Sequence, residues 1–110
     1  MKTNIQDPWV FAIEEKNLKT ESLILVSPKG LPILLIEKDG NLYAVENKCA
    51  HMACPLSGGV LDGYILQCPC HDWKFDIRTG DFIDAKEIKI STFGVRKAEG
   101  KIFINILGGK

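Results

Sequence analysis

The sequence lacks an excess of charge of either sign. Its fourteen lysines and arginines balance its fourteen aspartates and glutamates, which leaves a formal net charge of zero. The composition therefore gives no reason to expect a nucleic acid or an anionic membrane surface as a partner. This balance argues against a basic binding module.

Long apolar runs are also missing. The most apolar stretch, residues 23–36, contains two prolines, a glycine and a lysine, whereas a membrane-spanning helix needs about 20 consecutive apolar residues. The first eight residues contain no apolar segment of the kind that a signal peptide requires. We therefore expect a soluble, cytoplasmic protein with no membrane partner. A length of 110 residues is typical of one domain, so we expect a single domain over residues 1–110.

Histidine and cysteine are scarce, and none lies outside residues 49–71. This stretch holds both histidines and all four cysteines of the chain. It begins with Cys49-x-His51 and ends with Cys68-x-x-His71. Core packing would scatter such residues along the chain, whereas soft and borderline metals bind thiolate and imidazole ligands together. The stretch therefore predicts a metal site held by these two cysteines and two histidines.

The order of the four residues favours two metal ions over one. A single zinc ion is usually held by two pairs of the Cys-x2-4-Cys or His-x3-5-His kind. Here each loop brings one cysteine and one histidine, which suits a two-iron cluster with both thiolates on one iron and both imidazoles on the other. A structural zinc site from the same residues is a weaker alternative, because Cys-x-His is a short spacing for zinc. An all-cysteine site would leave both histidines unused.

The pattern resembles the Rieske family of [2Fe-2S] proteins, and the resemblance covers residues 42–84. A strand-like run precedes Cys49, and residues 55–63 and 75–80 match the family's segments between and after the two loops. The resemblance implies one [2Fe-2S] cluster per chain. Its cluster-binding residues would be Cys49 and Cys68 on one iron and His51 and His71 on the other.

The remaining cysteines, Cys54 and Cys70, fall where Rieske proteins of membrane complexes carry a disulfide. Soluble Rieske ferredoxins usually lack the pair, so the resemblance leaves two alternatives open. A disulfide between them would tie the two loops together. A reducing cytosol favours two free thiols instead, although a shielded bridge of low potential can survive there.

Outside this stretch the chain is a series of short apolar runs separated by turn signals. Asp39-Gly40 and Glu99-Gly100 favour tight hairpins, and Ile102, Ile104 and Ile106 alternate as in a strand buried on one face. The expected strands cover residues 9–13, 22–26, 33–36, 42–45, 94–97 and 102–106, and the helical candidate covers residues 14–19. We predict an all-β fold, an antiparallel sandwich or partial barrel. The resemblance adds an inserted cluster-binding subdomain, about residues 46–84, whose two loops meet at a tip.

The resemblance also implies a function in electron transfer. The protein would carry one electron at a time from a reductase, such as a flavoprotein, to a terminal enzyme such as an oxygenase. It would not be an enzyme itself, because a Rieske oxygenase needs a separate iron held by two histidines and a carboxylate, and this chain has no third histidine. The alternatives are a small subunit of a nitrite-reductase-like or other oxidoreductase complex, and a cluster-based redox sensor.

Two further expectations concern the surroundings of the cluster. No serine or tyrosine occurs in residues 72–75, where high-potential Rieske proteins carry hydroxyl donors, so we expect the lower part of the range of about −150 to +300 mV. Trp9, Trp73 and Phe75 are expected to be packing residues, with Trp73 shielding the cluster. Partners are expected to dock on an apolar rim, with packing between the loops as the alternative role of its members: Met52, Ala53, Pro55, Leu56 and Pro69.

Overall fold

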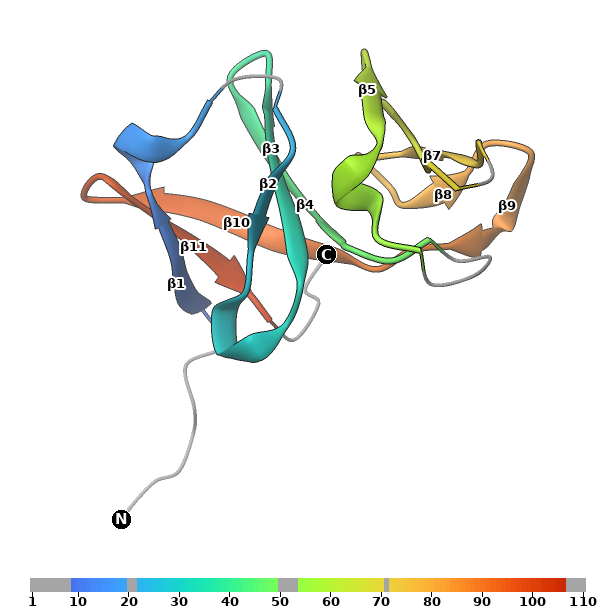
Figure 1. The fold of residues 1–110 in the computed structure, drawn as a ribbon. Helices are drawn as coiled ribbons and strands as arrows, with labels where there is room; N and C mark the ends of the chain where they lie inside the picture. Colours follow the sequence, from blue (N-terminus) through green and yellow to red (C-terminus); the bar gives the residue numbers. More distant parts are fainter. Residues whose placement is uncertain (1–8, 20–21, 50–53, 71, 107–110) are drawn as a thin grey trace.

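Two antiparallel sheets make up the fold in a computed structural model that describes residues 9–19, 22–49, 54–70 and 72–106. Figure 1 shows the two sheets beside each other, with β3 and β4 of the first sheet nearest the second. The first sheet has the order β1-β11-β10-β4-β3-β2, and the second has the order β5-β6-β7-β8-β9. The strands of the first sheet are β1 (Trp9–Glu14), β2 (Ile24–Val26), β3 (Ile33–Lys38), β4 (Asn41–Glu46), β10 (Thr92–Ala98) and β11 (Lys101–Asn105). Those of the second are β5 (Val60–Asp62), β6 (Ile65–Gln67), β7 (Lys74–Asp76), β8 (Asp81–Phe82) and β9 (Ala85–Lys89).

Both predicted hairpins of the first sheet are confirmed. Strands β3 and β4 pair antiparallel up to Lys38↔Asn41, and β10 and β11 pair up to Ala98↔Lys101. The two turn residues have positive φ in each case, 54° and 83° at Asp39-Gly40 and 54° and 78° at Glu99-Gly100. Two successive residues with positive φ are what a two-residue hairpin turn of type I′ requires. These turn dipeptides therefore fix the register of both hairpins.

The expected helix at residues 14–19 is wrong in type. Only Glu15–Asn17 is helical, as a single 3-10 turn named η1, and the backbone is extended again at Leu18. A segment this short forms too few hydrogen bonds to offset the entropy of nucleating an α-helix. The strand expected at residues 22–26 is shorter than predicted and begins at Ile24. Two other 3-10 turns occur in the described part of the chain, η2 (Pro28–Gly30) and η3 (Leu56–Gly58).

Strand β3 explains how the two sheets share a core. Four consecutive residues, 33–36, are fully buried, which requires cover on both faces of the strand. Ile33 and Leu35 pack within the first sheet against Ile102 and Ile104. Leu34 and Ile36 face the other way and pack in one cluster with the second sheet, whose members include Leu56, Leu66, Phe75 and Ile77.

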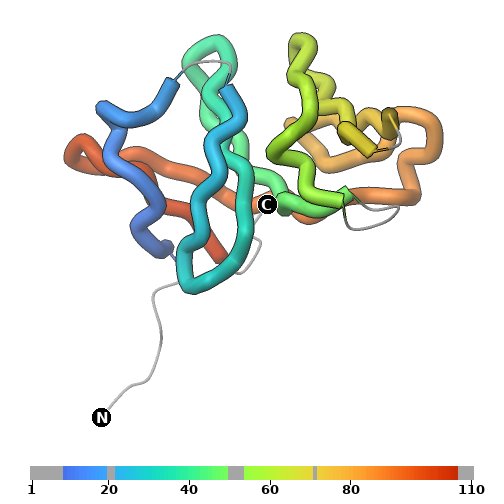
Figure 2. The backbone as a smooth tube through the Cα atoms, in the orientation of Figure 1, coloured from blue at the N-terminus to red at the C-terminus, as the bar shows by residue number. Residues whose placement is uncertain are grey.

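The second sheet lies between β4 and β10 in the sequence. Figure 2 shows the chain leaving the first sheet after β4 and returning to it through β9 into β10. The chain is thus all-β, with the second sheet set between two adjacent strands of the first sheet. Within the described residues, no helix is long and apolar enough to cross a membrane.

Candidate metal centre

The two cysteines predicted as ligands lie in the same buried cluster of side chains. Cys49 is 2% exposed and Cys68 is 0% exposed, and neither forms a disulfide. Cys49 follows the end of β4, and Cys68 directly follows β6. Both belong to the core that the two sheets share. The predicted ligands His51 and His71 lie outside the described residues.

Backbone and side-chain hydrogen bonds close the first loop, which contains Cys49. The amide of Cys49 donates to the carbonyl of Cys54 at 2.8 Å, and the amide of Asn47 donates to the carbonyl of Pro32 at 3.1 Å. Asn47 Oδ1 accepts the amide of Ser57 at 2.8 Å. Asn47 is only 8% exposed, so its side chain links the two ends of the loop inside the protein. Sequence reasoning did not identify Asn47, because a lone asparagine after a strand carries no specific signal.

The second loop, which contains Cys68, is closed in a similar way. The amide of Cys68 donates to the carbonyl of Trp73 at 2.7 Å, and the amide of Asp72 donates to the carbonyl of Cys68 at 3.1 Å. Gln67 Nε2 also donates to Asp72 Oδ1 at 2.9 Å. Asp72 has a φ of 61°, a left-handed conformation that aspartate tolerates better than most residues. Hydrogen bonds therefore join the residues before the loop to the residues after it.

The two loops are held against each other by a disulfide and by close backbone packing. Cys54 and Cys70 are bonded in the structure, with their Cα atoms 6.5 Å apart, which is inside the usual range for a disulfide. A Cβ atom on Gly58 would lie 3.8 Å from Pro69 of the second loop, and one on Gly59 would overlap the carbonyl oxygen of Gln67. Gly59 therefore allows the first loop to lie directly against the strand that leads to Cys68.

Three of the four cysteine sulfurs are close neighbours. The Sγ atoms of Cys54, Cys68 and Cys70 all lie within 4.8 Å of one another. Since Cys54 and Cys70 are bonded to each other, only Cys68 of this trio has a thiolate to offer a metal. Cys49 and Cys68 are therefore the two cysteines that take no part in the disulfide.

Aromatic side chains pack behind the second loop. Trp73 stacks on Phe82 with ring centroids 4.0 Å apart and an interplanar angle of 6°, and Phe75 contacts Phe82 at 5.7 Å. Phe75 is fully buried and Trp73 packs against the shared core. The packing role predicted for Trp73 and Phe75 is confirmed. Trp9 lies on the first sheet, where the guanidinium of Arg96 sits 4.4 Å from its ring centroid.

The predicted docking rim is wrong at one position. Leu56 is fully buried, because the η3 turn directs it into the shared core. It therefore packs between the loops and the sheets, the alternative role considered for it. Pro55 and Pro69 are exposed as expected, and Met52 and Ala53 lie outside the described residues.

A polar contact fastens the second sheet to the β3–β4 hairpin. Tyr64 Oη donates to Asp39 Oδ2 at 2.7 Å, and this hydrogen bond to a carboxylate raises the pKa of Tyr64 to about 12. Arg78 stacks on the Tyr64 ring at 4.4 Å and makes a two-point pair with Asp76 at 3.0 and 2.9 Å. The guanidinium of Arg78 lowers the pKa of Asp76. Tyr43 meets the Tyr64 ring edge to face.

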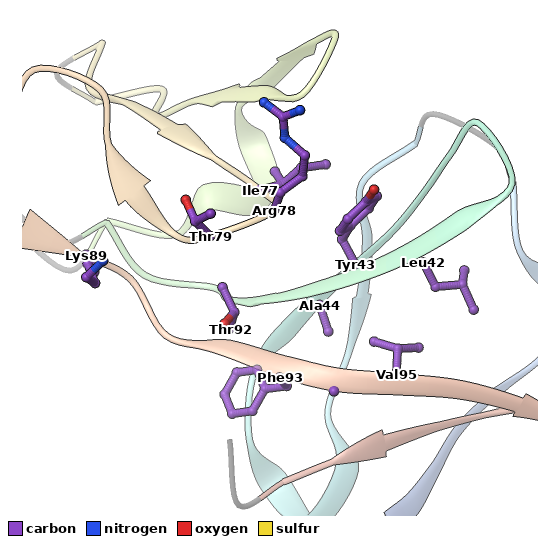
Figure 3. A pocket seen from close by; sticks show the side chains of 11 residues that line it. Leu42, Tyr43, Ala44, Ile77, Arg78, Thr79, Lys89, Thr92, Phe93 and Val95 are labelled. Carbon is purple, nitrogen blue, oxygen red and sulfur yellow. The ribbon is translucent and has the colours of Figure 1, made fainter. Parts of the chain in front are cut away.

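A groove of about 420 Å³ opens between the two sheets below this contact. Figure 3 shows its lining side chains, which come from β4, the turn after β7, β9 and β10. Its cations are already committed, since Arg78 pairs with Asp76 and Lys89 pairs with Asp81. Among the described residues, neither Cys49 nor Cys68 lines the groove.

Comparison with known proteins decides the family. The sequence profile of the Rieske [2Fe-2S] domain matches residues 8–94. The chain belongs to the Rieske [2Fe-2S] domain family. Membership in this family implies a [2Fe-2S] cluster, and it confirms the resemblance found in the cysteine and histidine pattern.

The similar proteins include ferredoxin components of dioxygenase systems, which are electron carriers and not catalytic subunits. The naphthalene 1,2-dioxygenase ferredoxin component of Pseudomonas aeruginosa is 29% identical over 101 residues, which cover 91% of this chain and 97% of that protein. The solved Sphingomonas yanoikuyae B1 ferredoxin is 27% identical and has a TM-score of 0.78, with 88% of this chain and 97% of that chain covered.

A third similar protein shares the Rieske fold at lower identity. It is a chain in the solved complex of reduced oxygenase and oxidized ferredoxin of carbazole 1,9a-dioxygenase. The TM-score is 0.81 at 24% identity, and the match covers 92% of this chain and 95% of that chain. At this identity the likeness concerns the fold alone, and it agrees with the two-sheet architecture described above.

Proposed function

We propose that this Rieske protein is a one-electron carrier whose cluster is bound by Cys49, His51, Cys68 and His71. One observation supports the ligand set most directly. The two cysteines without a disulfide are buried in one core at the bases of two loops that are bridged to each other. Two buried thiols with no role in the disulfide fit the thiolate half of a site with two cysteine and two histidine ligands.

The residues around these cysteines suit a redox group whose surroundings should stay fixed when it gains or loses an electron. When bound, a Rieske cluster accepts and releases one electron, at a potential that its histidine ligands raise above that of all-cysteine clusters. The amides of Cys49 and Cys68 are held by hydrogen bonds across their own loops. Leu56, Leu66 and Phe75 are fully buried and belong to the same apolar cluster as the two thiols. This packing excludes water from the thiolate side of the site.

The direction of electron flow in the proposal follows from the similar proteins. Because ferredoxin components of dioxygenase systems share nearly the whole length of this chain, we propose that the protein receives electrons from a reductase, such as a flavoprotein, and delivers them to a terminal oxygenase. Exposed Pro55 and Pro69 lie on the two bridged loops and provide a small, uncharged contact area of the kind that transient redox partners use. A cytoplasmic location is part of this proposal.

The test is a redox titration of anaerobically purified protein followed by electron paramagnetic resonance. We expect a Rieske-type signal that titrates as one electron in the lower part of the range of about −150 to +300 mV. A potential above about +200 mV would contradict the argument from the missing hydroxyl donors. Absence of the signal together with bound zinc would contradict the cluster itself.

Ligand assignments are tested by replacing cysteines one at a time. Cys49→Ser and Cys68→Ser should each abolish the native signal, because each removes one of two thiolates from the same iron. The double variant Cys54→Ser/Cys70→Ser is the matched control, since it removes two cysteines but no proposed ligand. It should keep a Rieske-type signal. Retention of the native signal in either single variant would refute the assignment.

A further inference from the structure

We propose that Cys54, Cys68 and Cys70 form an intramolecular thiol–disulfide exchange site that is blocked while Cys68 binds iron. The inference rests on the proposed function through the ligand role of Cys68. It goes beyond that function because it assigns a covalent reaction to the same residues when the cluster is lost. The reaction would exchange one bridge between the two loops for another.

The geometry places a thiol beside a disulfide. Cys68 Sγ lies within 4.8 Å of both sulfurs of the Cys54–Cys70 bridge. Since a disulfide bond is about 2.0 Å long, Cys68 needs to approach by less than about 3 Å to bond to one of them. A change of one side-chain rotamer moves a cysteine sulfur by about this much. The reaction therefore needs no rearrangement of the sheets.

The burial pattern makes this bridge the natural target of Cys68. Cys68 is fully buried, so oxidants and thiols in solution reach it poorly, whereas both sulfurs of the bridge lie within 4.8 Å of its sulfur. While iron is bound, the sulfur lone pair that would attack is engaged with the metal. Loss of iron frees the Cys68 sulfur next to a disulfide, which is the arrangement from which exchange proceeds.

The exchange balances without any external oxidant or reductant. The Cys68 thiolate attacks Cys54 Sγ, a Cys54–Cys68 bond forms, the Cys54–Cys70 bond breaks, and Cys70 leaves as the thiolate. The number of disulfides and free thiols is unchanged. The proton that Cys68 gave up is recovered from solvent by Cys70.

Cys54 is the sulfur that we expect to be attacked. Attack on Cys70 would close a small ring that contains Pro69, whose fixed φ restricts the geometry a disulfide needs. Attack on Cys54 keeps a bridge between the two loops and releases Cys70, which is exposed and whose thiolate is stabilised by water. The product has Cys68 locked in a disulfide and Cys70 free at the surface.

The experiment compares where free thiols lie before and after cluster loss. One sample of cluster-loaded protein, verified by its Rieske signal, is unfolded directly in denaturant with a maleimide at mildly acidic pH, where exchange is slow. A second sample first loses its iron to a chelator without oxygen, is kept folded at neutral pH, and is then labelled in the same way. Remaining disulfides are reduced and alkylated with a different reagent.

The two labels must be located by fragmentation. Residues 49–73 contain no lysine or arginine, so trypsin leaves all four cysteines in one peptide. Cleavage before Asp62 and Asp72 releases residues 62–71, which contain only Cys68 and Cys70. Backbone fragmentation at Pro69 then separates these two cysteines.

We expect the directly unfolded sample to carry maleimide on Cys49 and Cys68, and the cluster-free sample to show a shift of label from Cys68 to Cys70. Label that remains on Cys68, with Cys70 protected, would overturn the proposal. Label on Cys54 would overturn the assignment of the attacked sulfur. The Cys68→Ser variant is the control, because without the attacking thiol its Cys70 should stay protected. Failure of the proposed function would be seen separately, as the absence of the Rieske signal in the loaded sample.

Discussion

At the scale of single residues, the structure assigns the support of the first loop to Asn47. Replacing it with alanine leaves the amide of Ser57, now bonded to Asn47 Oδ1 at 2.8 Å, without its partner. We expect Asn47→Ala to lower the free energy of unfolding by about 1–3 kcal/mol, the cost of an unsatisfied buried polar group. Iron content after purification should fall as well, since Cys49 lies two positions further along the chain.

The control for Asn47 is Asn41→Ala. Asn41 is the first residue of β4 and Asn47 directly follows the last, but Asn41 is exposed, and exposed substitutions usually change stability by about 0.5 kcal/mol or less. Denaturant unfolding of both variants gives the comparison. Equal midpoints for the two variants would show that the Asn47 side chain does not hold the loop.

Tyr64 provides a prediction about pH. Its pKa is raised from 10.0 to about 12, mainly by the hydrogen bond that it donates to Asp39. A group whose pKa is higher in the folded protein than in the unfolded chain adds stability that is complete below the unfolded value and is lost as the pH rises through the folded value. We therefore expect the stabilisation from this contact to disappear between about pH 10 and pH 12.

Tyrosinate absorbance in the near ultraviolet checks this assignment. Tyr64→Phe should remove the titration at about pH 12, while it keeps the ring that stacks with Arg78. Asp39→Asn should move the same titration back toward 10.0, because the negative charge and the strongest acceptor are gone. A late titration that survives in Tyr64→Phe would rule out this tyrosine as its source.

At the scale of elements, the adjacent glycines Gly58 and Gly59 differ in how closely their backbone packs against the second loop and the strand before it. Gly59 touches the strand before Cys68 so closely that a Cβ atom would overlap the Gln67 carbonyl, whereas a Cβ on Gly58 would make an ordinary contact at 3.8 Å. We expect Gly59→Ala to push the loops apart and to destabilise the protein by about 1–3 kcal/mol, as overpacking does. Gly58→Ala is its control and should cost less.

Iron content and thermal unfolding measure the effect of both glycine variants. Gly59→Ala should bind less iron per chain, because the η3 turn and strand β6 can no longer lie as close to each other. The η3 turn follows the first loop and β6 leads into the second, so the two loops would separate as well. Gly58→Ala should load normally. The same loss of iron in both variants would point to the flexibility of glycine, and not to the close approach at Gly59, as the feature that matters.

The sequence predicted the elements of the first sheet much better than those of the second. Asp39-Gly40 and Glu99-Gly100 favour one turn type strongly, and the strands next to them are five to seven residues long, enough to show a pattern. The strands of the second sheet are two to five residues long. Periodicity cannot be recognised over so few residues, and the choice of residues there also has to satisfy the loops.

Prediction of the site from the sequence worked where the residue types report chemistry, and it failed where burial or contacts between distant segments decide. The pattern of cysteine and histidine reports chemistry directly, so the Rieske family could be recognised from it. Burial is set by tertiary packing, so Leu56 was assigned to an exposed rim although η3 turns it into the core. The supports provided by Asn47 and Gly59 depend on contacts between segments distant in the sequence, which no local signal reveals. The ligand roles of Cys49, His51, Cys68 and His71 remain predictions.

At the scale of the whole molecule, the core shared by the two sheets supports the expectation of a single domain over residues 1–110, which stays a prediction. Leu34, Ile36 and Val45 of the first sheet belong to the same buried cluster as Cys49 and Cys68. The Tyr64–Asp39 hydrogen bond adds a second connection between the sheets. If these contacts couple the two sheets, the first sheet and the candidate metal centre should unfold in one cooperative transition.

Leu34→Ala tests this coupling, because Leu34 is fully buried in the first sheet and faces the second. Its replacement should cost about 2–5 kcal/mol and should lower the melting temperature seen by far-ultraviolet circular dichroism and by visible cluster absorbance to the same extent. Leu25→Ala is the matched control, since Leu25 pairs with Leu34 across β2 and β3 but is 50% exposed. That variant should change stability by less than about 1 kcal/mol. If Leu34→Ala shifted the circular dichroism transition and left the cluster transition in place, the two sheets would be independent units, because a shared core cannot be weakened for one of them alone.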